Sequence, residues 1–420
     1  MTAAMVYREF AQSLKEICSR CDLVSGRPLL WTIIINPKAG GFTIKSRWKK
    51  HSRILAASVK KAANKPVLDI NAPSLCAIKN GGEYAEFGLV TTNHAGHAGE
   101  LARELLKEAA TAAGASHAAD SANATGAGSS APASKNPVYL IITAGGDGTS
   151  LEVLTALFHA PKEVRENFII LRLPMGTGND GSDSRNLDEA LDLLIEKAEV
   201  KYQRAISLGL RLSKSLGSNN NTSSLGDRSN EHMDSRSSGG SPNDSRLAFN
   251  ILSVGLDAFV THMTNKMKGK LPGDSYKLWV DIAALFYDKI YHVDKMEVSV
   301  FDEAGNKLGS LNEKFLLMAM GESGCRTYGA NKKILPDERN ICCMRQMPLF
   351  RKFFIKGLMS SGAHVNEKEA VLFTGSRMEI KCNHPILAQM DGETILLEKD
   401  DFPIVIELTD PVIPIIKKLS

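Results

Sequence analysis

The sequence lacks the features of a secreted or membrane-spanning protein. Its seven cysteines follow no regular spacing of the kind that marks a disulfide framework, which favours a reducing compartment. No apolar run approaches the roughly 18 residues that a membrane-spanning helix needs. Charged residues from Arg8 to Glu16 interrupt the N-terminus, so no signal-peptide core is present there. We therefore expect a cytoplasmic protein, with any membrane contact peripheral and at the inner face.

A large excess of one charge is also missing. The chain of 420 residues has 51 Lys and Arg against 47 Asp and Glu, a formal net charge of +4. This excess is too small to indicate nucleic acid as a partner, although it is compatible with contact to an anionic surface. Hydrophobic residues make up 43%, as in ordinary globular proteins, and the length suffices for two or three domains.

Two common phosphate-binding signatures are absent. Lys45-Ser46 lacks the glycine that precedes the lysine of a P-loop, and the motifs of protein kinases are missing. The segment Gly176–Gly181 fits the GxGxxG pattern of dinucleotide-binding enzymes. It follows the fourth expected strand, however, whereas that fingerprint belongs to the first strand–helix–strand unit of its domain. An oxidoreductase is therefore a minor alternative.

The first half of the chain alternates between apolar, strand-like runs and helical patterns. Strands are predicted at 30–35, 88–90, 138–143 and 167–173. Helices are predicted at 1–25, 46–63, 98–112, 149–159 and 187–197. This order is typical of an α/β domain with an open, mainly parallel sheet.

Strand-like segments dominate the second half. They lie at 204–212, 247–254, 295–301, 314–320, 340–347, 369–374, 377–382 and 403–408. Helical patterns interrupt them at 274–290 and 349–360. The pattern predicts a β-rich, antiparallel sandwich. The C-terminal tail is expected to pack back on the first domain.

These patterns predict three parts, namely a helical N-terminal extension (1–29), an α/β domain (30–200) and a β-rich domain (201–420). Two stretches are low in complexity. Residues 113–136 are rich in Ala, Gly and Ser, and residues 213–246 are rich in Ser, Asn and Gly. Both have too little apolar surface to offset the entropy lost on ordering, so we expect disordered surface insertions.

Three Gly-rich turns follow apolar strands in the first domain: Asn36–Gly41, Gly145–Thr149 and Pro174–Asp180. In an open α/β sheet such turns meet at the carboxyl edge, where ligands bind. Glycines let backbone N–H groups approach a phosphate, and each following helix adds a favourable dipole. Asp147 and Asp180 are in position to hold Mg²⁺, with capping of the following helix as the alternative. The turns thus favour binding of a nucleoside triphosphate.

The three turns, in this order, resemble the diacylglycerol kinase catalytic domain family, which includes bacterial lipid kinases and sphingosine kinases and has a fold related to NAD kinase. The turn Pro174–Asp180 is similar to the lipid-kinase branch rather than to NAD kinases. The likeness covers about residues 30 to 410. It continues in four further segments: Thr92–Ala102, Asn250–Ala258, Tyr328–Pro336 and Ala388–Glu393.

The resemblance implies a kinase that uses ATP and Mg²⁺ to phosphorylate a lipid hydroxyl, on diacylglycerol, a sphingoid base or a related lipid. Glu393 would be the base that accepts the proton of this hydroxyl. Asp147 and Asp180 would organise Mg²⁺ and the phosphates, and Asp391 would orient its loop or join a metal network. The implied ATP site consists of Asn36, Gly40, Gly41, Thr92, Gly145, Gly146, Gly148, Thr149, Gly176, Thr177 and Asn179.

The sequence departs from the family pattern at two places. After Asp180 the family continues with Phe and a basic residue, whereas this chain reads Gly181-Ser-Asp-Ser-Arg185. After Pro336 the family has an Asp-Gly pair that contributes to a structural metal network, and this chain has Asp337-Glu-Arg-Asn340 instead. The departures concern the structural metal and the acceptor rather than the ATP turns.

Two other functions stay open: a kinase of NAD or another small alcohol, and a degenerate kinase that acts as a nucleotide-binding sensor. Asp391-Gly392 by itself also suits the turn of a plain β-hairpin. A homodimer is one alternative for the oligomeric state.

A lipid substrate would bring the protein to a membrane surface. Phe350–Lys356 and Met263–Lys270 combine basic and apolar residues in a way that suits such contact. Ordinary amphipathic helices with solvated basic faces are the simpler interpretation of both segments.

Overall fold

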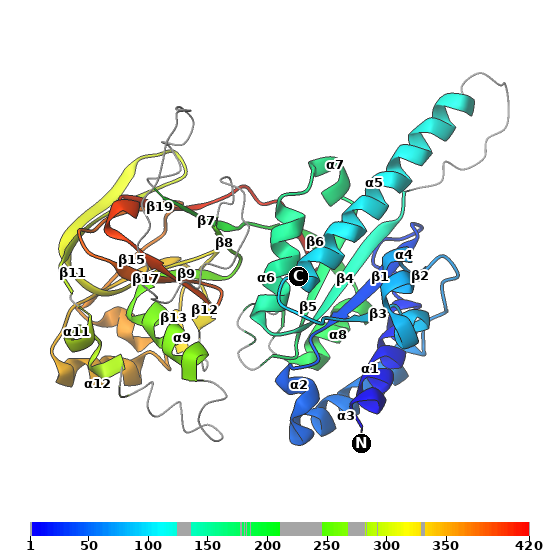
Figure 1. Ribbon diagram of the computed structural model, residues 1–420, viewed down its shortest axis with the longest axis horizontal. Coiled ribbons are helices and arrows are strands. Elements are labelled where there is room, and N and C mark those ends of the chain that lie inside the picture. The colour runs from blue at the N-terminus through cyan, green and yellow to red at the C-terminus, as the bar shows by residue number, and fades with distance from the viewer. Residues whose placement is uncertain are drawn as a thin grey trace, which may run out of the picture. The chain divides into compact units, whose positions relative to one another are not determined.

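The computed structural model describes residues 2–123, 136–176, 179, 181, 183–184, 186–210, 246–267, 282, 284–291, 293–328 and 332–419. The chain divides into two compact units (Figure 1). Unit 1 contains Met1–Ala205, Thr327–Lys332 and Thr409–Ser420, and unit 2 contains Ile206–Arg326 and Lys333–Leu408.

Unit 1 is built on a seven-stranded sheet in the order β2-β1-β4-β5-β20-β6, with β3 beside β1. Strand β1 pairs in parallel with β3 and β4, and β4 pairs in parallel with β5. Every residue of β4 and β5 is buried, as expected where both faces of a parallel sheet are covered. The predicted open, mainly parallel sheet is confirmed. The strands span β1 Leu29–Ile35, β2 Ala72–Pro73, β3 Leu89–Thr91, β4 Val138–Gly145, β5 Phe168–Pro174, β6 Ala198–Gln203 and β20 Ile413–Lys418.

The C-terminal tail is the last strand of this sheet. β20 runs parallel to β5 and antiparallel to β6. Its side chains Ile413, Ile415 and Ile416 are buried, so apolar contact as well as the sheet holds it in place. The expectation that the tail packs back on the first domain is therefore confirmed.

Helices lie on both sides of the sheet in unit 1. Helices α1, α3 and α8 pack against one another and share a buried core with β1. Helices α5 and α6 pack on each other on the other side (Figure 1). The helices span α1 Ala3–Cys18, α2 Gly40–Thr43, α3 Lys45–Ala62, α4 Leu75–Asn80, η1 Gly82–Phe87, α5 His97–Asn123, α6 Asp147–Phe158, α7 Lys162–Arg165 and α8 Leu187–Ile195.

The N-terminal helix belongs to the core of unit 1. Phe10, Leu14 and Ile17 on one face of α1 are fully buried. The Phe10 ring meets the Phe42 ring edge-on, with 5.1 Å between the centroids. One face of α1 is therefore part of this core, although the sequence pattern predicts a separate N-terminal extension.

Unit 2 is mainly antiparallel β-structure, which confirms the predicted β-rich second part. Its strands follow the order β18-β17-β9-β11-β10-β16-β19-β7-β8, with β14 beside β11 and β15 beside β14. They span β7 Ile206–Gly209, β8 Arg246–Ala248, β9 Ile251–Gly255, β10 Lys295–Phe301, β11 Lys307–Gly321, β14 Ile341–Arg345, β15 Ala370–Phe373, β16 Arg377–Lys381, β17 Ile386–Met390, β18 Glu393–Leu397 and β19 Ile404–Leu408.

Shorter elements complete the second half of the chain. Strands β12 Arg326–Tyr328 and β13 Lys332–Leu335 form a separate ribbon. The helices are α9 Leu256–Met267, α11 Tyr287–Ile290, α12 Leu349–Leu358, η3 Ala363–Asn366 and η4 Lys399–Asp401. Within the described ranges, no helix is both long enough and apolar enough to cross a membrane.

The structure differs from the sequence patterns at the predicted insertions. Residues 113–123 continue α5, because their many alanines favour a helix. Residues 124–135 of the first predicted insertion and 213–245 of the second lie outside the described residues, and Arg246 is the first residue of β8. The predicted helix at 274–290 is described in its last part, where α11 spans Tyr287–Ile290.

We predict that Phe10→Ala lowers the free energy of unfolding by about 3–5 kcal/mol, because it leaves a cavity in a closely packed core. Met5→Ala on the same helix is the matched control, since Met5 is 57% exposed. Urea titration followed by circular dichroism measures both. Equal stability of the two variants would mean that α1 is a dispensable extension.

Candidate functional site

The turn after β1 is tied to the ends of β4 and β5. The Asn36 backbone N–H donates to the carbonyl of Ala144 over 3.1 Å, and its side-chain amide lies 3.5 Å from the Thr149 hydroxyl. The Gly41 N–H donates to the Met175 carbonyl over 2.8 Å. A Cβ atom on Gly41 would lie 2.9 Å from that same oxygen, so this contact requires glycine. Gly40 lies beside it, buried in α2.

The turn after β4 leads into α6. Gly146 is the N-cap residue of α6, and because glycine has no side chain it forms no side-chain cap. Thr149 is buried in the first turn, and Gly148 lies between it and Asp147. The N-terminus of α6 therefore has the backbone donors and the dipole that attract an anion.

The turn after β5 lies directly against the turn after β4. A Cβ atom on Gly176 would lie 2.7 Å from the Cα of Gly146 and 3.0 Å from the Gly145 carbonyl. A Cβ on Gly146 would meet nothing within 4 Å. Close packing of the two turns therefore requires glycine at position 176, whereas position 146 has room for a side chain.

The third turn continues toward Asp147. Asn179 has a left-handed backbone with φ of 62°. The Gly181 N–H donates to the Asp147 carboxylate over 3.1 Å. Thr177 and Asp180 lie outside the described residues, so their roles stay predictions.

Glu152 connects this region to α5. Its carboxylate accepts hydrogen bonds from the backbone N–H groups of Gly96, Ala98 and Gly99 over 2.8, 3.1 and 3.4 Å. The N-terminus of α5 is therefore occupied by a carboxylate of the protein itself. The nearby Thr92 is held by its own N–H, which donates to the Ile35 carbonyl over 2.9 Å. No local pattern in the sequence points to this role of Glu152, because its partners lie more than 50 residues away along the chain.

The first departure from the family pattern is a structural anchor. The side chain of Asp183 is fully buried, and its carboxylate accepts from the Arg172 guanidinium over 2.7 Å and from the Arg172 backbone N–H, also over 2.7 Å. Arg172 also donates to the Gln203 side chain over 2.9 Å. This buried ion pair ties the segment after the third turn to β5 and β6. Its loss would leave an unpaired buried charge.

In unit 2, the acidic turn is a hairpin between β17 and β18. Asp391 and Gly392 have φ angles of 47° and 98°, as a turn of the I′ class requires. The Asp391 carboxylate accepts from the backbone N–H groups of Phe249, Asn250 and Ile251 over 2.5, 3.0 and 2.9 Å. Asp391 therefore fastens the hairpin to β9, and its predicted metal role stays a prediction.

A buried polar network lies beneath this hairpin. The Gln389 amide donates to the Ser253 hydroxyl over 3.0 Å and accepts from the Gly392 N–H over 2.9 Å. Ser253 is also hydrogen-bonded to the Asp257 carboxylate. The segments Asn250–Ala258 and Ala388–Glu393, which resemble the kinase family in sequence, are therefore in contact in the structure. Glu393, at the start of β18, is exposed.

The second departure concerns Asp337. The Arg339 guanidinium donates to its carboxylate over 2.9 and 2.5 Å and holds the pKa of Asp337 below its usual range. Across the described ranges, no group of three or more His, Cys, Asp or Glu residues could hold a metal ion. The residues at 337–340 therefore do not fit the structural metal of the family, because an arginine supplies the positive charge beside Asp337.

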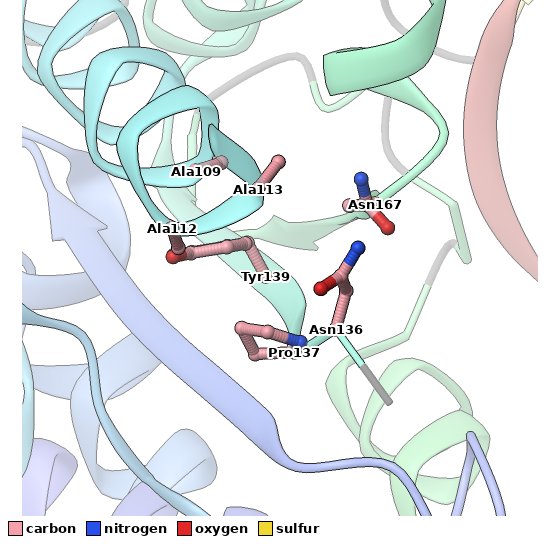
Figure 2. Close-up of a pocket in the computed structure, with 7 residues that line it drawn as sticks. All are labelled: Ala109, Ala112, Ala113, Asn136, Pro137, Tyr139 and Asn167. Carbon is pink, nitrogen blue, oxygen red and sulfur yellow. The ribbon is translucent and has the colours of Figure 1, made fainter. Parts of the chain in front are cut away.

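A small cavity lies at the opposite edge of the sheet in unit 1 (Figure 2). Pro137 and Asn167, which line it, precede β4 and β5, whereas the Gly-rich turns follow these strands. It has room for about one water molecule. It is too small for a nucleotide or a lipid. The remaining lining residues are Ala109, Ala112, Ala113, Asn136 and Tyr139.

We predict that Gly176→Ser lowers the free energy of unfolding by about 1–3 kcal/mol, because its side chain would clash with the backbone of the neighbouring turn. The same change at Gly146 should preserve stability, since the backbone there is extended and serine is a good N-cap. Thermal and urea unfolding would compare the two variants. A stable Gly176→Ser protein would contradict the close contact of the turns.

Comparison with known proteins gives both a sequence match and fold matches. The sequence model described as "Diacylglycerol kinase catalytic domain" matches residues 78–210. This range includes the second and third Gly-rich turns, but neither the turn at 36–41 nor the hairpin at 391–393. A search of curated proteins gave no match.

Solved structures match over most of the chain. A crystal structure described as a "putative diacylglycerol kinase" from Bacillus anthracis has 16% sequence identity and a TM-score of 0.50, covering 92% of this chain and 94% of that one. A second structure from the same organism has 15% identity, a TM-score of 0.48 and coverage of 92% and 96%. Yeast NADH kinase complexed with NADH has 12% identity, a TM-score of 0.37 and coverage of 93% and 83%. At such low sequence identities a match shows the fold alone. Of these three structures, the first, with its TM-score of 0.50, is similar enough to show it. Residues 78–210 therefore match the model of a kinase domain family, and the chain has the fold of the first bacterial structure.

Proposed function

We propose that the protein transfers the γ-phosphoryl group of ATP to the hydroxyl group of a lipid. The observation that carries the proposal is the N-terminus of α6, which has a glycine as its N-cap residue and lies where two Gly-rich turns within residues 78–210 touch. A triphosphate needs backbone donors, room close to the main chain and a nearby carboxylate for its cation. This region offers all three, the carboxylate being Asp147.

The phosphates would bind at the N–H groups of the first turn of α6. The helix dipole and a glycine N-cap, which has no side chain of its own to bind these N–H groups, favour an anion there, whereas Glu152 already occupies the N-terminus of α5. The glycines that line this turn, together with Asn36 and Thr92, would border the nucleotide.

One carboxylate in this region, Asp147, fits a bound Mg²⁺, because Mg²⁺ in kinases is held mainly by substrate phosphates with one or two protein carboxylates. The predicted second carboxylate is Asp180. Bound Mg²⁺ would offset the negative charge of the phosphates and draw charge from the transferred group.

Glu393 would accept the proton of the attacking hydroxyl. Its exposed carboxylate stands at the end of a hairpin whose position is fixed by the three hydrogen bonds to Asp391 and by the network of Gln389. Such fixation holds a base in one place, which proton transfer requires. The acceptor lipid would be diacylglycerol, a sphingoid base or a related lipid.

We predict that Glu393→Gln lowers the turnover number about 10²–10⁴-fold without changing ATP affinity, because it removes only the proton acceptor. Glu407→Gln, an exposed glutamate on β19 of the same unit, is the matched control. Transfer of labelled γ-phosphate would be measured with diacylglycerol, phosphatidylglycerol, sphingosine and ceramide in mixed micelles, with NAD as the soluble acceptor. Labelled NADP would favour a small-molecule kinase. ATP binding with no product from any acceptor would favour a sensor.

The Gly146→Ser variant tests the phosphate position separately. Its hydroxyl would cap α6 and compete with the phosphates for the same N–H groups, so we predict ATP binding about tenfold weaker at unchanged stability. Calorimetric titration with ATP and Mg²⁺ measures this. Unchanged affinity would move the phosphates away from α6.

A further inference from the structure

Helix α12 carries an exposed row of phenylalanines. Phe350, Phe353 and Phe354 are 90%, 56% and 51% exposed. Their spacing of three and four residues places them on one side of the helix. Single exposed apolar side chains are ordinary, but three aromatic rings on one side of one helix form a continuous apolar surface. We call these three side chains the phenylalanine ridge.

The ridge is held outward by contacts on the other side of α12. Lys352 and Ile355 are buried there. Lys352 forms an ion pair with Asp288, which also accepts from the Gln346 side chain over 2.6 Å. These contacts fasten α12 to the segment that contains α11 and fix which side of the helix faces solvent.

Arg351 fixes the rotation of the helix further. It forms ion pairs with Glu367 over 2.8 Å and Glu369 over 2.6 Å, and its guanidinium lies 5.2 Å from the centre of the Phe354 ring. The helix itself contains no acidic residue. Two of its three cations are thus neutralised by carboxylates of the same unit, and the outward surface is chiefly aromatic.

The size and shape of the ridge suit a membrane better than a second protein chain. With aromatic side chains of about 200 Å² each, the exposed fractions amount to roughly 400 Å². A stable protein interface needs about 800 Å² from each partner and a complementary surface. The acyl boundary of a bilayer accepts a narrow, convex ridge without any complementary shape.

We propose that α12 is a membrane-docking helix that inserts Phe350, Phe353 and Phe354 into the interfacial region of a phospholipid bilayer. Delivery of a lipid acceptor by this docking rests on the proposed function, but the docking itself requires neither ATP nor acceptor. Of the two segments that the sequence suggested for membrane contact, Phe350–Lys356 lies wholly within the described residues.

The test compares binding of the full chain to sedimented vesicles of phosphatidylcholine with a minority of phosphatidylglycerol. We expect a Phe350→Ser/Phe354→Ser variant to bind at least about tenfold more weakly than the natural chain, since each buried ring contributes to partitioning. Leu308→Ser, on β11 of the same unit, is the matched control, because Leu308 is 45% exposed. High salt should leave most of the binding intact.

A second measurement reports on insertion directly. The fluorescence of a Phe350→Trp variant should shift to shorter wavelength on vesicle binding and be quenched by brominated lipid. Absence of vesicle binding by the natural chain, or equal binding by the double serine variant, would overturn the proposal. Self-association that the serine changes abolish, without vesicle binding, would assign the ridge to a second copy.

Kinase assays separate this proposal from the proposed function. With a water-soluble, short-chain acceptor, the double serine variant should keep the turnover of the natural chain, while its activity on vesicle-borne acceptor should fall with its binding. Vesicle binding without any phosphoryl transfer would contradict the proposed kinase function and support membrane docking by α12.

Discussion

A backbone contact joins the turns after β4 and β5, and the candidate phosphate site depends on it. Gly176 passes so close to Gly145 and Gly146 that no side chain fits between them. Gly41 approaches the Met175 carbonyl in the same way. Parallel pairing of β1, β4 and β5 sets the three turns side by side, and the glycines let them close. The N-terminus of α6 is thereby bordered by main chain, which an anion can approach directly.

The acidic residues near the Gly-rich turns and the β17–β18 hairpin divide into two groups by what they contact. Glu152, Asp183 and Asp391 accept hydrogen bonds from two or more donors of the protein and hold loops in place. Asp147, at the start of α6, accepts a hydrogen bond from the Gly181 N–H. Glu393 is exposed at the end of a fixed hairpin. In the proposed function, phosphoryl transfer would depend on Asp147 and Glu393, which fixed loops present, rather than on the carboxylates that fix these loops.

The predictable parts of the fold are those that a local pattern decides. The apolar runs at β1, β4 and β5 predict these strands, because a strand buried on both faces needs a continuous apolar sequence. The common edge of their turns then follows from parallel pairing. The contacts of Glu152 with α5 and of Arg172 with Asp183 could not be predicted from the sequence. Each of these residues alone resembles an ordinary charged surface residue, and only the fold supplies its partner.

In helix α12 the sequence pattern and the structure assign opposite sides to solvent. The pattern of Leu349–Leu358 favours a solvated basic face, yet Lys352 is buried and Phe350 is exposed. Burial works to raise the pKa of Asp288, but hydrogen bonds from Lys352 and Gln346 outweigh it and hold that pKa below its usual range. A carboxylate that stays ionised offsets the desolvation of the lysine. This ion pair, together with buried Ile355 and the ion pairs of Arg351, fixes the rotation of α12, and helical spacing then turns the phenylalanine rings outward.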